Sequence, residues 1–157
     1  MGAHHFKLYV VPPGSHPTRG AEGEYDGFFL LGFDLEEVVV QRFRSLLPNA
    51  NPWGKVEEFN SASQWGSDLR IFREDDGRVA EVVMRYAPAG DSIQMLRAFI
   101  EVVKQAGCEL LVETTGEVVA PEPEPVLAAL RGHRAFRFLT DPEGAIKEAA
   151  DDTNQKC

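Results

Sequence analysis

Hydrophobic and polar residues alternate along several short stretches of the chain, and each such stretch predicts a β-strand. In residues 5–11, Phe6, Leu8 and Val10 fall on one side, as expected for a strand with one buried face. The same alternation occurs over 68–73, 78–86 and 109–114. Between the second and third of these four stretches, Gly77 can adopt the positive φ of a tight turn, which predicts a β-hairpin.

Two other stretches have the spacing of amphipathic helices. The first begins at Asp34, with Glu37 three residues later completing a capping box, and ends before Pro48. The second runs from Asp91 to about residue 106, with Asp91 and Gln94 as its capping box. Residues 25–33 are strongly apolar and predict either a short strand or a segment packed across the core. A further short strand is expected over 56–59.

The predicted elements follow the order strand, helix, strand, strand, helix, strand, which is that of the ferredoxin-like fold. Right-handed connections would place both helices on one face of a four-stranded antiparallel sheet. At 157 residues the chain is expected to form one α+β domain over 1–157. We predict a core over about 5–115, a proline-rich linker over 116–125 and a helical C-terminal segment over 126–151.

The alternation also divides the predicted sheet into two faces. We expect a buried face made of Phe6, Leu8, Val10, Leu69, Ile71, Val82, Met84, Leu110 and Val112. The opposite face is expected to hold His5, Lys7, Tyr9, Asp68, Arg70, Phe72, Glu81, Val83, Arg85, Leu111 and Glu113. Because this second face mixes aromatic, aliphatic and charged residues, we expect the chain's own loops, a second copy, a ligand or a partner to cover it.

The candidate binding residues follow from this division. On the second face they are His5, Tyr9, Arg70, Phe72, Glu81 and Arg85. Two further candidates are Trp53 and Trp65, which lie in an irregular region and suit the anchors of a protein interface.

Motifs for catalysis, metals and cofactors are not found in the sequence. His4, His5, His16 and His133, with Cys108 and Cys157, lack the spacing of a zinc site. The glycines of residues 14–27 do not form a phosphate-binding loop. We therefore predict no cofactor and no metal, and we favour a protein that is not an enzyme.

The net charge of −9 restricts the partners of the protein. An acidic surface repels phosphate backbones and anionic lipids, so we expect neither nucleic-acid nor membrane binding. No apolar run reaches the length of a membrane span. Two cysteines in a domain without a disulfide framework suggest a cytoplasmic protein.

Three functional hypotheses remain. The first is a non-enzymatic acidic binding module, such as a bacterial immunity-type inhibitor that masks a basic partner protein. The second is a small enzyme or ligand-binding protein of the dimeric α+β barrel kind, which would use the open sheet face as a pocket. The third is a structural homodimer with no assignable activity.

Overall fold

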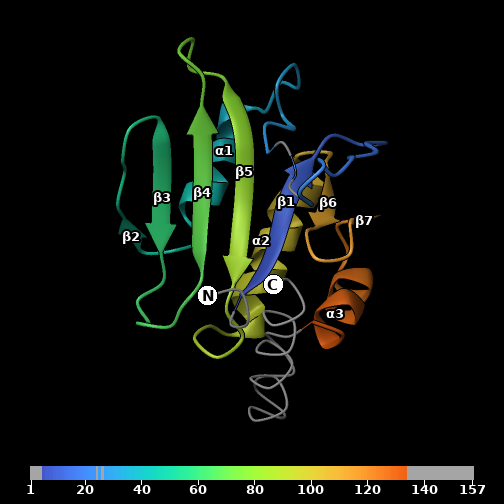
Figure 1. The fold of residues 1–157 in the computed structure, drawn as a ribbon. Coiled ribbons are helices and arrows are strands. Elements are labelled where there is room, and N and C mark those ends of the chain that lie inside the picture. Colours follow the sequence, from blue (N-terminus) through green and yellow to red (C-terminus); the bar gives the residue numbers. More distant parts are fainter. Residues whose placement is uncertain (1–4, 24, 26, 134–157) are drawn as a thin grey trace.

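The computed structural model describes residues 5–23, 25 and 27–133. These residues form an α+β fold with one antiparallel sheet and three helices (Figure 1). The strands are β1 (Phe6–Val11), β2 (Asn49–Ala50), β3 (Val56–Asn60), β4 (Asp68–Arg73), β5 (Val79–Tyr86), β6 (Glu109–Val112) and β7 (Glu117–Val119). The helices are α1 (Glu37–Arg44), α2 (Ile93–Gln105) and α3 (Pro123–Arg131).

The sheet has seven strands in the order β2-β3-β4-β5-β1-β6-β7, and is therefore larger than the four-stranded sheet expected from the sequence. The four predicted strands form its centre as β4-β5-β1-β6. Strand β3 matches the short strand expected over 56–59, and β2 pairs with its outer edge. The two-residue β2 is too short to show an alternating pattern.

The stretch predicted as a linker, residues 116–125, instead contains β7 and the start of α3. Its three prolines suggested an extended connection, but Val118 and Val119 pair with Leu111 and Leu110 of β6. Val119 is buried in the core. The burial of this side chain favours a strand here, although the surrounding acidic and proline-rich residues favour an extended linker.

The predicted hairpin is confirmed. Strands β4 and β5 pair from Asp68 opposite Arg85 to Arg73 opposite Val79. At the turn Gly77 has a φ of 88°, and its N–H donates to the carbonyl of Glu74. A residue with a Cβ would be strained there, which is why glycine closes this hairpin.

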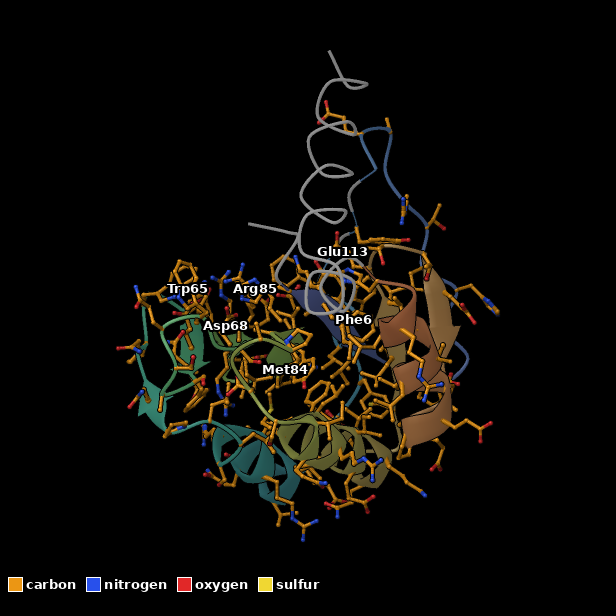
Figure 2. The ribbon with its side chains drawn as sticks, turned by 90° about the horizontal axis from the view of Figure 1, so that it is seen from below. Phe6, Trp65, Asp68, Met84, Arg85 and Glu113 are labelled. Carbon is orange, nitrogen blue, oxygen red and sulfur yellow. The ribbon has the colours of Figure 1, made fainter. Side chains whose placement is uncertain are left out.

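The assignment of the two faces is also confirmed. All nine residues of the predicted buried set lie in the main hydrophobic core. Helices α1 and α2 pack on this inner face (Figure 1), and their Phe43 and Phe99 are fully buried. Figure 2 shows the alternation directly, with Met84 on the helix side of the sheet and its neighbour Arg85 on the other side.

Both predicted capping boxes are wrong. Helix α1 begins at Glu37 and α2 at Ile93, and neither has a side-chain hydrogen bond at its N-cap. The Asp91 carboxylate instead accepts hydrogen bonds from the Ser61 hydroxyl at 2.6 Å and from the Ser67 N–H at 2.5 Å. Asp91 therefore joins the β3–β4 loop to the connection between β5 and α2.

The C-terminal helical segment expected over 126–151 is described only in its first part. Helix α3 begins at Pro123, where proline suits the first turn. Val126 and Leu130 of α3 belong to the core, so this helix packs as part of the domain. Residues 134–151 lie outside the described residues.

Candidate functional site

Within the described residues, the outer face of the sheet, opposite α1 and α2, divides into a covered half and an open half. The covered half lies over β1, β5 and β6, where Tyr9, Val11, Val83 and Leu111 form a second small apolar cluster. Tyr25 and Phe29 pack against this cluster from the β1–α1 connection, and the Phe29 ring meets Tyr9 edge to face at 5.4 Å. Residues 25–33 thus supply part of the cover expected from the sequence, as an irregular segment rather than a strand.

Hydrogen bonds fasten this connection to the β6–β7 turn. The Arg19 guanidinium donates to the Tyr25 hydroxyl and to the carbonyls of Glu113 and Thr114, each at 2.8 Å. The connection also lies close to the sheet: a Cβ on Gly27 would come within 1.6 Å of the Glu81 carboxylate and within 3.5 Å of the Tyr9 ring. Tyr9 and Glu81 are buried beneath it, each with only 8% of its surface exposed.

The open half lies over β3 and β4 and carries aromatic side chains. Phe72 of β4 is half-buried and contacts two other rings edge to face, Phe28 at 6.1 Å and Trp53 at 6.4 Å. Trp53 is 51% exposed and Phe28 is 46% exposed. The three rings form one aromatic strip at the end of β4 nearest its turn.

Glu58 of β3 organises the polar part of the open half. One of its oxygens accepts hydrogen bonds from Arg70 Nε at 2.8 Å and Trp53 Nε1 at 3.3 Å. The other accepts from the Asn60 amide at 3.2 Å. Burial raises the pKa of Glu58, but the hydrogen bonds from Asn60 and Trp53 and the charge of Arg70 outweigh burial and lower it overall. Glu58 therefore stays ionised and holds Trp53 and Arg70 in place.

A second ion pair lies next to this network. Arg85 donates to both oxygens of the buried Asp68, with Nε at 2.9 Å and Nη2 at 2.5 Å from Oδ2. These hydrogen bonds, opposed by burial and aided by the charge of Asp68, raise the pKa of Arg85. Arg70 Nε also lies 3.8 Å from Asp68. The two carboxylates and two guanidiniums form a connected and electrically neutral row.

Trp65 lies at the opposite end of β4 from the aromatic strip, in the β3–β4 loop, and is 67% exposed. Figure 2 shows it with Arg85 on the side of the sheet away from the helices. Its loop is held by His5, whose Nε2 lies 3.3 Å from the Gly66 carbonyl oxygen, and by the Asp91 bond to Ser67. A Cβ on Gly90 would approach the Trp65 carbonyl within 2.5 Å, so Gly90 permits this loop to pack closely.

The predicted site residues thus share one face but do not converge on one pocket. Arg70 and Phe72 lie with Trp53 in the open half, whereas Tyr9 and Glu81 lie under the β1–α1 connection. Sequence reasoning missed Glu58. The sequence indicated only that Glu58 lies in the short strand over 56–59. It did not indicate that this strand would pair with β4 and bring Glu58 next to Arg70.

Other chemistry in the described residues is limited. Cys108 is buried, and burial raises the pKa of its thiol to about 11, so it is almost entirely protonated at neutral pH. Within residues 5–133 as described, no group of three or more His, Cys, Asp or Glu side chains is placed to bind a metal ion. No helix of the same residues is long and apolar enough to span a bilayer.

Comparisons with known proteins found no relative of this chain. Neither a protein-family model, nor a curated protein, nor a solved structure matches it.

Proposed function

We propose that this protein is a non-enzymatic, acidic binding module of the cytoplasm that masks a basic partner protein, in the manner of an immunity-type inhibitor. The partner docks on the open half of the outer face, which we call the docking face and define as Phe28, Trp53, Trp65, Arg70 and Phe72. The four central strands with α1 and α2 are proposed to form a ferredoxin-like unit, which is supported by the order β4-β5-β1-β6, and the docking face lies where β3 adds to its β4 edge.

The observation that carries the proposal is the exposure of two tryptophans on a face whose other half is closed by the chain itself. Trp53 and Trp65 are 51% and 67% exposed, while Tyr9 under the β1–α1 connection is 8% exposed. Tryptophan and arginine are the residue types most enriched among the residues that dominate binding energy at interfaces. The fold buries Tyr9 on the same face, so the large exposed areas of the two tryptophans support a role in contacting a partner.

The distribution of charge over this chain supports a basic partner. The docking face lies on a neutral row of Glu58, Asp68, Arg70 and Arg85, whereas the whole chain carries −9. The charges on this face are paired with one another, and the surplus negative charge of the rest of the chain guides the approach of a partner of opposite sign. A second copy of this chain would carry the same −9 and would be repelled at low salt.

Site-directed photo-crosslinking in the producing cells tests this proposal. A photoreactive residue replaces Leu31, which borders Phe28 and is 52% exposed, or Val38 on α1, which is 55% exposed and serves as the matched control. We expect the Leu31 probe, and not the Val38 probe, to capture a basic protein. That protein, once purified, should bind the unmodified chain, and Trp53→Ala should weaken binding by roughly tenfold or more.

Three results would contradict the proposal: capture of the same proteins from both positions, capture of an acidic protein, or binding unaffected by Trp53→Ala. Capture of a second copy of the chain at residue 31 would favour the structural homodimer instead. The ligand-binding alternative has less support, because Tyr25 and Phe29 occupy the part of the outer face over Tyr9 that a pocket would need.

A further inference from the structure

Arg70 has more hydrogen-bonding capacity than the domain uses. Its Nε donates to Glu58 at 2.8 Å, and the guanidinium lies 5.9 Å from the centre of the Trp53 ring. Its two terminal nitrogens make no hydrogen bond with any described residue, although the side chain is only 33% exposed. A half-buried guanidinium with four unused N–H groups favours an additional acceptor from outside the chain.

Glu58 fixes the position of these donors before anything binds. The same carboxylate oxygen accepts from Arg70 Nε and from Trp53 Nε1, so the guanidinium and the indole ring are oriented together. Preorganised side chains lose less conformational entropy on binding than mobile ones. Phe72 also restrains the Trp53 ring, through an edge-to-face contact.

Local charge decides which acceptor fits. Glu58 and Asp68 already lie 2.8 Å and 3.8 Å from Arg70, and Arg85 is engaged by Asp68. A ligand carboxylate would add a third negative charge beside two, whereas a neutral carbonyl accepts the same hydrogen bonds without that repulsion. The exposed Trp53 ring next to the donors offers contact area to an apolar or aromatic group.

We infer that Arg70, Trp53 and Glu58 form a preorganised site for a neutral carbonyl group flanked by an apolar or aromatic side chain. In the setting of the proposed function, on which this inference rests for its biological meaning, the basic partner contributes an uncharged residue here. That residue offers a main-chain or amide carbonyl to Arg70 and packs its side chain against Trp53.

Titration of the full chain with three small probes, followed by NMR of the Trp53 indole and Arg70 Nε–H signals, tests the site without the partner. N-acetyl-L-phenylalaninamide carries two neutral amide carbonyls beside an aromatic ring. N-acetyl-L-phenylalanine has a carboxylate in place of the terminal amide, and L-phenylalaninamide has an ammonium group in place of the acetylated nitrogen. We expect the neutral probe to shift both signals with a dissociation constant of about millimolar order. The carboxylate probe should bind several-fold more weakly.

Two variants and a control make the test specific. Arg70→Lys keeps the charge but removes the planar fork of donors, and should weaken the neutral probe by roughly tenfold. Glu58→Gln should speed hydrogen exchange of the Trp53 indole N–H, because a neutral amide oxygen accepts a weaker hydrogen bond from it than the carboxylate does. Arg78→Lys, at an exposed arginine paired with Asp76 in the hairpin turn, should change neither the binding nor the indole exchange.

The inference is overturned if no probe shifts the Trp53 and Arg70 signals at tens of millimolar, if the carboxylate probe binds best, or if Arg70→Lys has the same effect as Arg78→Lys. Its failure is distinguishable from that of the proposed function. The probes report on the site alone, and the crosslinking experiment reports on the existence and charge of the partner.

Discussion

Single residues in this domain are specified by contacts that lie far away in the sequence. Gly90 is an example. Its N–H donates to the Ala87 carbonyl in the turn after β5, and this turn packs against the distant Trp65 loop. A Cβ at this position would lie 2.5 Å from the Trp65 carbonyl oxygen and 2.7 Å from the Gly66 Cα. Both contacts are with backbone atoms, which cannot turn aside as the end of a long side chain can.

Gly90→Ala is therefore expected to destabilise the domain by about 1–3 kcal/mol and to displace the Trp65 loop. Gly132→Ala is the matched control, because among the described residues its Cβ would meet nothing closer than 3.8 Å and its φ of −85° suits any residue. Urea unfolding followed by tryptophan fluorescence gives the free energy of unfolding of both variants. Equal stability of the two would show that the loop yields without cost.

At the scale of elements, the loops and helix ends depend on side chains that a local pattern assigns elsewhere. Asp34 and Asp91 both have the sequence context of helix caps, yet α1 and α2 begin two or more residues later without side-chain caps. Asp91 bonds Ser61 and Ser67, and Ser67 in turn accepts from the Ala87 N–H. Asp34 makes no hydrogen bond with the described part of the chain.

These different environments predict different costs for the same substitution. Asp91→Ala should destabilise the domain by about 1–3 kcal/mol, because it leaves the Ser67 N–H without its charged acceptor. Asp34→Ala should change stability by less than about 0.5 kcal/mol. Thermal or urea unfolding of both variants measures the difference. If Asp34→Ala proved the more costly, the capping interpretation from the sequence would be restored.

At the scale of the molecule as described, the sheet separates two surfaces that are packed differently. Its inner face meets α1 and α2 in a continuous core, while its outer face is closed over β1, β5 and β6 and open over β3 and β4 (Figures 1 and 2). The open half is neutral in charge, and the chain as a whole is acidic. Under the proposed function, this combination would favour association with a basic molecule over self-association.

The chain alone is accordingly expected to be monomeric in sedimentation equilibrium at both about 20 mM and about 500 mM salt, which span weak and strong screening of surface charge. If screening revealed a dimer at high salt, a Trp53→Glu variant would show whether it forms through the docking face. A dimer that this substitution abolished would contradict the preference for a basic partner and support the homodimer.

The amino-acid sequence by itself determined the α+β class, the four central strands, the β4–β5 hairpin and the division of the sheet into two faces. Each of these follows from local properties: side chains alternate along any strand, and Gly77 alone of its turn tolerates a φ of 88°. The place of Arg70 on the outer face also followed from the alternation, and the irregular region that holds Trp53 and Trp65 indicated that both could be exposed.

Only the tertiary structure decided which half of the outer face stays open, that β2, β3 and β7 enlarge the sheet, and that Glu58 orients both Trp53 and Arg70. These features depend on contacts between different elements, such as Phe29 on Tyr9, Val118 opposite Leu111 and Arg70 on Glu58. A local pattern states which residues can be buried or paired. The packing of the whole domain selects the partner of each, because burial and hydrogen bonding are satisfied for all elements at once.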